Sequence, residues 1–183
     1  MPTTLILIDL QNDYFSGGKM ELVGSPAAVG QAARLLAFFR DRGWPVAHVQ
    51  HVSTRPGASF FLPDTDGVRH HASVAPAAGE TLVVKHFPNA FRETDLLEKL
   101  RALGADQLVV AGMMTHMCVD AGVRAAADLG FPVLLASDAC ATRDLSFGGA
   151  TVPAAQVHAA FLAALGSYAA VLPVDALLAR LAE

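Results

Sequence analysis

The sequence predicts an α/β fold with three layers, in which a mainly parallel six-stranded sheet lies between helices. Short apolar runs alternate with segments whose apolar residues recur at helical spacing, which is typical of successive parallel βαβ units. Hydrophobic residues form 53% of the 183 residues and charged residues 16%, a composition that suits strands buried on both faces. No repeat or change of composition divides the chain, so residues 1–183 are expected to form a single domain.

Six short apolar runs are the predicted strands. Glycine, proline or polar residues bound them, as is usual for buried strands. They lie at Leu5–Leu10, Pro45–Val49, Thr81–Lys85, Gln107–Ala111, Pro132–Ala136 and Ala169–Leu172.

Helices are predicted between these strands. The first begins at Ser25 and Pro26, an N-cap and a first-turn proline, and ends at Gly43. The others run from about Thr94 to Gly104, over Thr115–Leu129, from Pro153 through Leu165, and around Leu177, Leu178 and Leu181 at the end of the chain.

The segment Val52–Gly79 has no sustained periodicity and contains several prolines and glycines. A loop of this length in a compact domain usually has a function. We expect it to determine substrate specificity.

Charge and cysteine content narrow the class of protein. The net charge is −4 and no basic cluster is present, which argues against nucleic acid as a partner. No apolar run approaches the roughly 20 residues of a membrane span, and the N-terminus does not resemble a signal peptide. A cytoplasmic protein is expected, with Cys118 and Cys140 reduced and a small molecule as substrate.

Three residues with reactive side chains follow predicted strands. Asp9 ends the first strand, Lys85 ends the third, and Cys118 lies just beyond the fourth, where it opens a predicted helix. Each has an ordinary structural interpretation: a loop cap, a solvated lysine and a small core residue. Because ligands collect at the carboxyl ends of parallel strands, the three together point to a catalytic site.

The chemistry of these groups favours a cysteine nucleophile. A thiol attacks as its thiolate, and we expect a lysine ammonium and a helix N-terminus to lower the pKa of Cys118. The carboxylate of Asp9 would accept the thiol proton and later donate it to a leaving amine.

Three segments in order, Asp9–Phe15, Lys85–Phe91 and Gly112–Val119, resemble the isochorismatase-like cysteine hydrolases. That family includes nicotinamidases and N-carbamoylsarcosine amidase. The resemblance covers nearly the whole chain, and it implies the isochorismatase-like fold and a tendency to form homo-oligomers.

The resemblance also implies the parts of an active site. Asp9, Lys85 and Cys118 would be its catalytic triad. A cis peptide bond would join Met113 and Met114, and the backbone N–H groups of Met114 and Cys118 would form the oxyanion hole.

Two features depart from members of the family. Nicotinamidases carry an Asp-Trp-His type metal segment after the second strand, where this chain has Val49–Ser53. We therefore expect no metal and no cofactor, and nicotinamide is disfavoured as the substrate. Isochorismatases themselves lack the cysteine nucleophile, so Cys118 argues against hydrolysis of isochorismate.

Further residues are candidates for the substrate pocket. They are Gln11, Phe15, Phe60, Phe61, Phe87 and Phe91. Asp13 is interpreted as structural. For His116, a role facing solvent or an interface stays open beside a role at the site.

The predicted function is hydrolysis of a small-molecule C–N bond, amide or carbamoyl, through a thioester on Cys118. One alternative is a thiol redox protein in which Cys140 resolves an oxidised Cys118. The other is a catalytically silent oligomeric scaffold.

Overall fold

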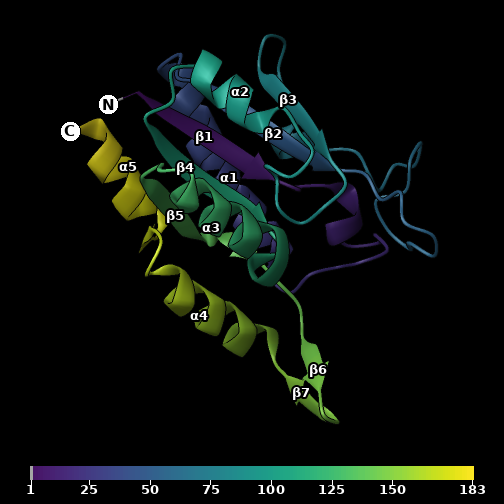
Figure 1. The fold of residues 1–183 in the computed structure, drawn as a ribbon. Coiled ribbons are helices and arrows are strands. Elements are labelled where there is room, and N and C mark those ends of the chain that lie inside the picture. The colour runs from purple at the N-terminus through teal and green to yellow at the C-terminus, as the bar shows by residue number, and fades with distance from the viewer. Residues whose placement is uncertain (1) are drawn as a thin grey trace.

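The computed structural model describes residues 2–183, and its centre is a parallel sheet of six strands. Figure 1 shows this sheet crossing the molecule, with helices on both sides. The spatial order is β3-β2-β1-β4-β5-β8, and each neighbouring pair is parallel. The six strands are β1 (Thr3–Ile8), β2 (Val46–His51), β3 (Thr81–Lys85), β4 (Gln107–Met113), β5 (Val133–Ala141) and β8 (Ala170–Leu172).

Helices cover both faces of the sheet, which confirms the predicted three-layer α/β fold. The helices are α1 (Ser25–Asp41), α2 (Leu96–Ala102), α3 (Asp120–Asp128), α4 (Ala154–Leu165) and α5 (Val174–Ala182). Two apolar clusters, one on each face, divide the core: residues of α1 and α5 belong to one, and residues of α2, α3 and α4 to the other.

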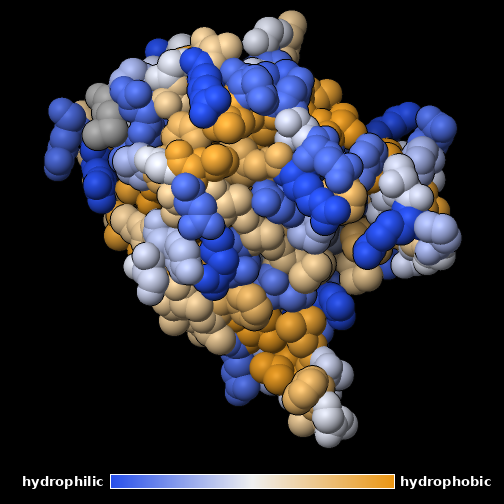
Figure 2. Space-filling model, in the orientation of Figure 1, coloured by the Kyte–Doolittle hydropathy of each residue, from blue (hydrophilic) through white to orange (hydrophobic). Residues whose placement is uncertain are grey.

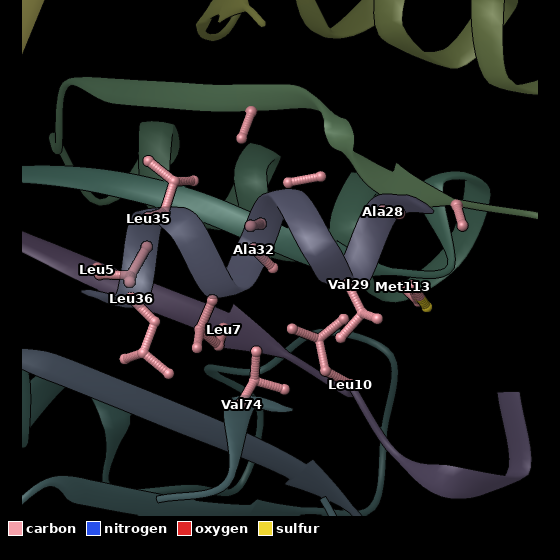
Figure 3. Close-up of a cluster of buried hydrophobic side chains, with 14 of the residues drawn as sticks. Leu5, Leu7, Leu10, Ala28, Val29, Ala32, Leu35, Leu36, Val74 and Met113 are labelled. Atoms are coloured by element: carbon pink, nitrogen blue, oxygen red, sulfur yellow. The ribbon is translucent and has the colours of Figure 1, made fainter. Parts of the chain in front are cut away.

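The packing of α1 shows how the sequence pattern becomes a layer. Its apolar residues recur at helical spacing, so they form one stripe that faces the sheet. Figure 3 shows Ala32 and Leu36 of this helix above Leu5 and Leu7 of β1, and Val29 beside Leu10, which follows β1. All of these side chains are almost completely buried. Burial of one leucine of this kind contributes roughly 1.5–3 kcal/mol.

Most predicted elements are present, with shifted ends. The predicted helix Thr115–Leu129 begins instead with a π-helical turn, Thr115–Val119, before α3. Short 3-10 turns lie at Asn12–Tyr14 and Ala72–Val74, and β5 continues to Ala141, well beyond the predicted Ala136. The longer β5 reaches the same edge of the sheet as the end of β4.

A small hairpin was not predicted from the sequence. It consists of β6 (Leu145–Phe147) and β7 (Ala150–Val152), which pair antiparallel around Gly148 and Gly149. Both glycines have positive φ, as a two-residue hairpin turn requires. The hairpin projects from the body of the protein (Figure 1), and its surface is largely apolar (Figure 2), with Phe147 89% exposed. The strands are too short to give a clear alternating pattern.

The order of the sheet determines where a site can form. The chain runs outward from β1 through β2 to β3, then returns to the other side of β1 with β4 and β5. At such a reversal the connections leave a crevice outside the carboxyl ends of the central strands. Among residues 2–183 no helix is long and apolar enough to cross a membrane.

Candidate active site

Four neighbouring strands each bring one side chain to this edge of the sheet. Lys85 ends β3, His51 ends β2, and the two are register partners. Asp9 follows β1 directly, and Cys118 lies in the π-helical turn after β4. The structure therefore brings together Asp9, Lys85 and Cys118, which the sequence analysis had singled out.

Asp9 leaves β1 in an unusual backbone conformation. Its φ is 52°, in the left-handed region that a non-glycine residue seldom occupies. Its N–H still donates to the carbonyl of Val49 at 3.0 Å, so the turn begins while the residue is paired with the end of β2. Backbone strain of this kind is typical of functional sites. The side chain of Asp9 is completely buried.

The ammonium of Lys85 connects the site. It lies 2.7 Å from Asp9 Oδ2, 2.9 Å from His51 Nδ1, 3.1 Å from the carbonyl of Phe87 and 3.2 Å from Cys118 Sγ. Burial alone would lower the pKa of Lys85, but its interactions with Asp9 and Cys118 together outweigh that effect, so the pKa is raised. Lys85 is therefore a permanent cation in contact with both the carboxylate and the sulfur.

The pKa of Cys118 corrects the expectation from sequence. Burial, and next the negative charge of Asp9, raise the pKa of the thiol, and the opposing effect of Lys85 is smaller. The thiol is 5% exposed, so few water molecules can stabilise a thiolate. In the resting protein Cys118 is a neutral thiol beside a charged pair.

Two hydrogen bonds hold the turn that carries Cys118. Thr115 Oγ1 and His158 Nδ1 of α4 lie 2.9 Å apart, and His116 Nδ1 contacts Thr142 Oγ1 just after β5. His116 is half-buried and also packs against Phe161. This hydrogen bond anchors the turn that carries Cys118 to the chain after β5, a structural role for His116 that the sequence did not indicate.

The end of β4, just before this turn, packs closely against β1. Gly112 has a φ of 145°, and a Cβ at this position would collide with the backbone carbonyl of Ile8 in β1. Only glycine fits there. The Met113–Met114 peptide bond is cis. Met114 then contributes to the same cavity wall as Cys118.

A cavity of about 520 Å³ opens onto Cys118. Phe60, Phe61 and Phe87 line it, together with His51, Met114 and Met117. Three other predicted pocket residues, Gln11, Phe15 and Phe91, are absent from this lining within residues 2–183. Phe15 instead stacks on His71 and lines a separate cavity, and Phe91 packs against the apolar cluster that contains α2.

Gln11 is a structural residue rather than a pocket residue. Its Nε2 donates to the carbonyls of His51 and Val68, at 2.9 and 2.8 Å, and its Oε1 accepts from the N–H of His51 at 2.8 Å. The side chain thus pairs with the end of β2 as another strand would. It was assigned to the pocket because a polar residue after a strand end is indistinguishable, in sequence, from a substrate ligand.

The structural interpretation of Asp13 agrees with its contacts. Its carboxylate accepts from the N–H groups of Lys19 at 3.1 Å and Phe61 at 2.6 Å. Asp13 therefore ties the loop after β1 to the long segment between β2 and β3. That contact places Phe61 in the cavity wall.

Sequence reasoning did not identify His51 as a member of the site. The available signal was its position: the last residue of one strand, beside the strand that ends in Lys85. Arg55, His86 and Arg92, which also line the cavity, were likewise not singled out.

One group of potential metal ligands lies within the described residues. Asp9, His51 and Cys118 each offer an atom within 4.8 Å of the others. The ammonium of Lys85 already contacts all three. A metal cation would lie against this positive charge, so the arrangement suits the lysine rather than a metal ion.

Cys140 is separate from the cavity of Cys118. It lies in β5, is free, and its Sγ donates to the carbonyl of Ala136 at 3.3 Å. Burial raises the pKa of its thiol to about 12. These features are those of a core cysteine.

Comparison with known proteins decides the family. The profile of the Isochorismatase domain matches residues 3–174. The chain belongs to the isochorismatase family. The family protein YddQ of Bacillus subtilis is 50% identical over 179 residues, which cover 97% of this chain and 99% of YddQ.

Solved structures of this family have the same fold. The crystal structure of a protein from Oleispira antarctica, described as an isochorismatase hydrolase, superposes on this chain with a TM-score of 0.94 at 55% sequence identity. The match covers 97% of this chain and 96% of that one.

Three family members that resemble this chain are named as hydrolases or amidases of small molecules. Streptothricin hydrolase of Streptomyces noursei is 37% identical over 173 residues, which cover 92% of this chain and 61% of that protein. Maleamate amidohydrolase of Pseudomonas putida and nicotinamidase of Escherichia coli also match. The family thus includes amidases with different substrates.

Proposed function

We propose that this isochorismatase family protein is a cysteine amidohydrolase that cleaves the C–N bond of a small amide or carbamoyl compound. The observation that carries the proposal is the position of the Lys85 ammonium. It contacts Asp9 at 2.7 Å and Cys118 at 3.2 Å, behind a cavity that opens onto the sulfur. A base, a cation and a nucleophile are therefore adjacent where a substrate can enter.

The raised pKa of Cys118 defines the first step. A resting thiolate is disfavoured, so the proton moves to Asp9 as the sulfur attacks the substrate carbonyl. Lys85 remains an ammonium and offsets the negative charge that passes from the carboxylate to the sulfur. The carbon–sulfur bond forms while the carbonyl oxygen takes up negative charge.

The following steps return the site to its starting state. The backbone N–H groups of Met114 and Cys118 would stabilise the oxyanion, an effect often worth about 3 kcal/mol per donor. Protonated Asp9 donates its proton to the leaving amine as the C–N bond breaks. Water then attacks the thioester, Asp9 accepts its proton, and that proton returns to the sulfur as the acid leaves.

Named relatives support the class of reaction. Streptothricin hydrolase, maleamate amidohydrolase and nicotinamidase all match this chain, and the names of the last two denote amide hydrolysis. The redox alternative has less support, because the thiol of Cys140 is hydrogen-bonded to the backbone carbonyl of Ala136 and Cys140 does not line the cavity of Cys118.

The test is release of ammonia or amine from a panel of primary amides, carbamoyl compounds and cyclic amides. We expect the wild-type protein to hydrolyse at least one of them. Cys118→Ala should abolish turnover and leave the thermal unfolding midpoint close to wild type. Near-wild-type turnover by Cys118→Ala would refute the proposed mechanism.

Mild peroxide treatment separates the redox alternative from hydrolysis. Intact-mass analysis should show no Cys118–Cys140 disulfide when the protein stays folded. A stable disulfide between the two, together with no turnover of any amide, would favour the redox function.

A further inference from the structure

We propose that the catalytic cavity selects amides that also carry a carboxylate, which Arg55 and Arg92 bind at its mouth. The inference rests on the proposed amidohydrolase function, because it names the substrate class of that site. Arg55 and Arg92 are separate from the triad: both are exposed and line the outer part of the cavity.

Arg55 supplies one positive charge. It lies in the long segment between β2 and β3, lines the cavity and is exposed to solvent. Within residues 2–183 its side chain has no hydrogen-bond or ion-pair partner. The positive charge of Arg55 is felt at His51 in the cavity wall. Burial is the main reason that the pKa of His51 is lowered to about 4, and the charge of Arg55 lowers it slightly further.

Arg92 supplies a second charge from a different segment, after β3. Its guanidinium lies 3.7 Å from the centre of the Phe87 ring, and both residues line the cavity. This stacking orients the planar guanidinium before any substrate binds. Glu93 lies 3.6 Å away, but both side chains are more than half exposed, so their ion pair neutralises Arg92 only weakly.

No negative side chain balances these arginines at the cavity wall. Among the described residues 2–183, none of those that line the cavity is an aspartate or a glutamate. The nearby carboxylate of Asp9 is buried and paired with Lys85 at 2.7 Å. The mouth of the cavity therefore carries a net positive charge.

A carboxylate fits this environment chemically. Arginine binds carboxylates through two parallel hydrogen bonds, which position as well as attract the ligand. The amide at the other end of the substrate would then extend past Phe60 and Phe87 toward Cys118. A monoamide of a dicarboxylic acid has this combination of groups.

The experiment compares substrates that differ only in charge. Succinamate and succinamide have nearly the same shape, and glutaramate and adipamate with their diamides extend the series. We expect kcat/KM of wild type to favour one or more monoamides over the matched diamide by about tenfold or more. Arg92→Gln and Arg55→Gln should each reduce that ratio several-fold, and Arg92→Glu should bring it below one.

Arg69→Gln is the matched control. Arg69 lies in the same long segment as Arg55, pairs with Asp66 at 3.7 Å and is 75% exposed, but does not line this cavity. Its substitution should leave the ratio unchanged. A wild-type ratio near one for every pair, or equal ratios in wild type and the Arg55 and Arg92 variants, overturns the inference.

A binding measurement distinguishes failure of the inference from failure of the proposed function. Isothermal titration of Cys118→Ala with each monoamide and diamide reports anion selection without turnover. Preferential binding of a monoamide that Arg92→Gln weakens, with no hydrolysis by wild type, supports the site and refutes the amidase. Hydrolysis of amides without preferential binding of any monoamide refutes the inference alone.

Discussion

The Nζ of Lys85 lies 2.9 Å from Nδ1 of His51, and this contact determines the state of the histidine. The ammonium can only donate, so Nδ1 accepts and the ring proton resides on Nε2. Burial, and next the charge of Lys85, lower the pKa of His51 to about 4. His51 is thus a neutral imidazole at neutral pH. It lines the cavity beside Cys118.

We expect His51→Leu to reduce kcat and to lower the free energy of unfolding by about 2 kcal/mol, because Lys85 loses a buried acceptor. His51→Asn keeps an acceptor close to the position of Nδ1 and should recover most of both losses. Urea denaturation and steady-state kinetics test the pair. Equal effects of the leucine and asparagine variants would show that the acceptor is unimportant.

Asp9 and Lys85 form a buried ion pair, so we expect removal of one partner alone to destabilise the fold more than removal of both. Lys85→Met leaves a buried carboxylate without its partner, which should cost about 3–5 kcal/mol of stability. The double variant Asp9→Asn/Lys85→Met removes both charges, so its free energy of unfolding should lie closer to wild type. A double variant as unstable as the sum of the single variants would contradict this account.

The reactivity of Cys118 should depend on Asp9 and pH. Because burial and the charge of Asp9 raise the thiol pKa, alkylation by iodoacetamide should be slow near pH 7 and accelerate as pH rises toward that pKa. Asp9→Asn removes a negative charge, so the pKa should fall and alkylation near pH 7 should be faster. Cys140→Ala in both proteins restricts labelling to Cys118. If the apparent pKa of Cys118 is unchanged or higher in Asp9→Asn, the charge of Asp9 does not raise the pKa of the thiol.

Gln11 and Gln50 form a matched pair for testing how His51 is positioned. Both side chains donate to the carbonyl of Val68, but Gln11 also bonds the N–H and carbonyl of His51. Gln11→Leu should lower stability by about 2–3 kcal/mol and reduce kcat. Gln50→Leu leaves the bonds to His51 intact and should reduce stability by less than about 1 kcal/mol, without a loss of kcat. Similar kcat in the two variants would count against a positioning role.

Gly112 should not tolerate a side chain. In Gly112→Ala the new Cβ would meet the carbonyl of Ile8, and the residue would have to keep a φ of 145°, which side chains disfavour. We therefore expect the free energy of unfolding to fall by more than about 3 kcal/mol. Gly122→Ala is the control: its Cβ would lie 3.3 Å from the flexible Cδ1 of Ile8, within α3. Its stability should change by less than about 1 kcal/mol. Chemical denaturation of both variants measures the difference.

Local pattern was sufficient for the layers of this fold. The apolar stripe of α1 and the buried runs of β1 and β4 depend on residues adjacent in sequence, so they were recognisable there. The hairpin around Gly148 and the π-helical turn before α3 were not. Their segments are too short to show a period, and contacts such as that of Thr115 with His158 hold the turn from elsewhere in the chain.

The sequence by itself determined that Asp9, Lys85 and Cys118 follow strands of a parallel sheet. Only the tertiary structure decided the state of the thiol and the roles of Gln11 and His51. Desolvation depends on every atom around a group, and the atoms around Cys118 come from distant segments, so the sign of its pKa shift could not be read from the helix that follows it. For the same reason the cavity contains Arg55, Arg92 and Phe61, which three-dimensional packing alone brings together.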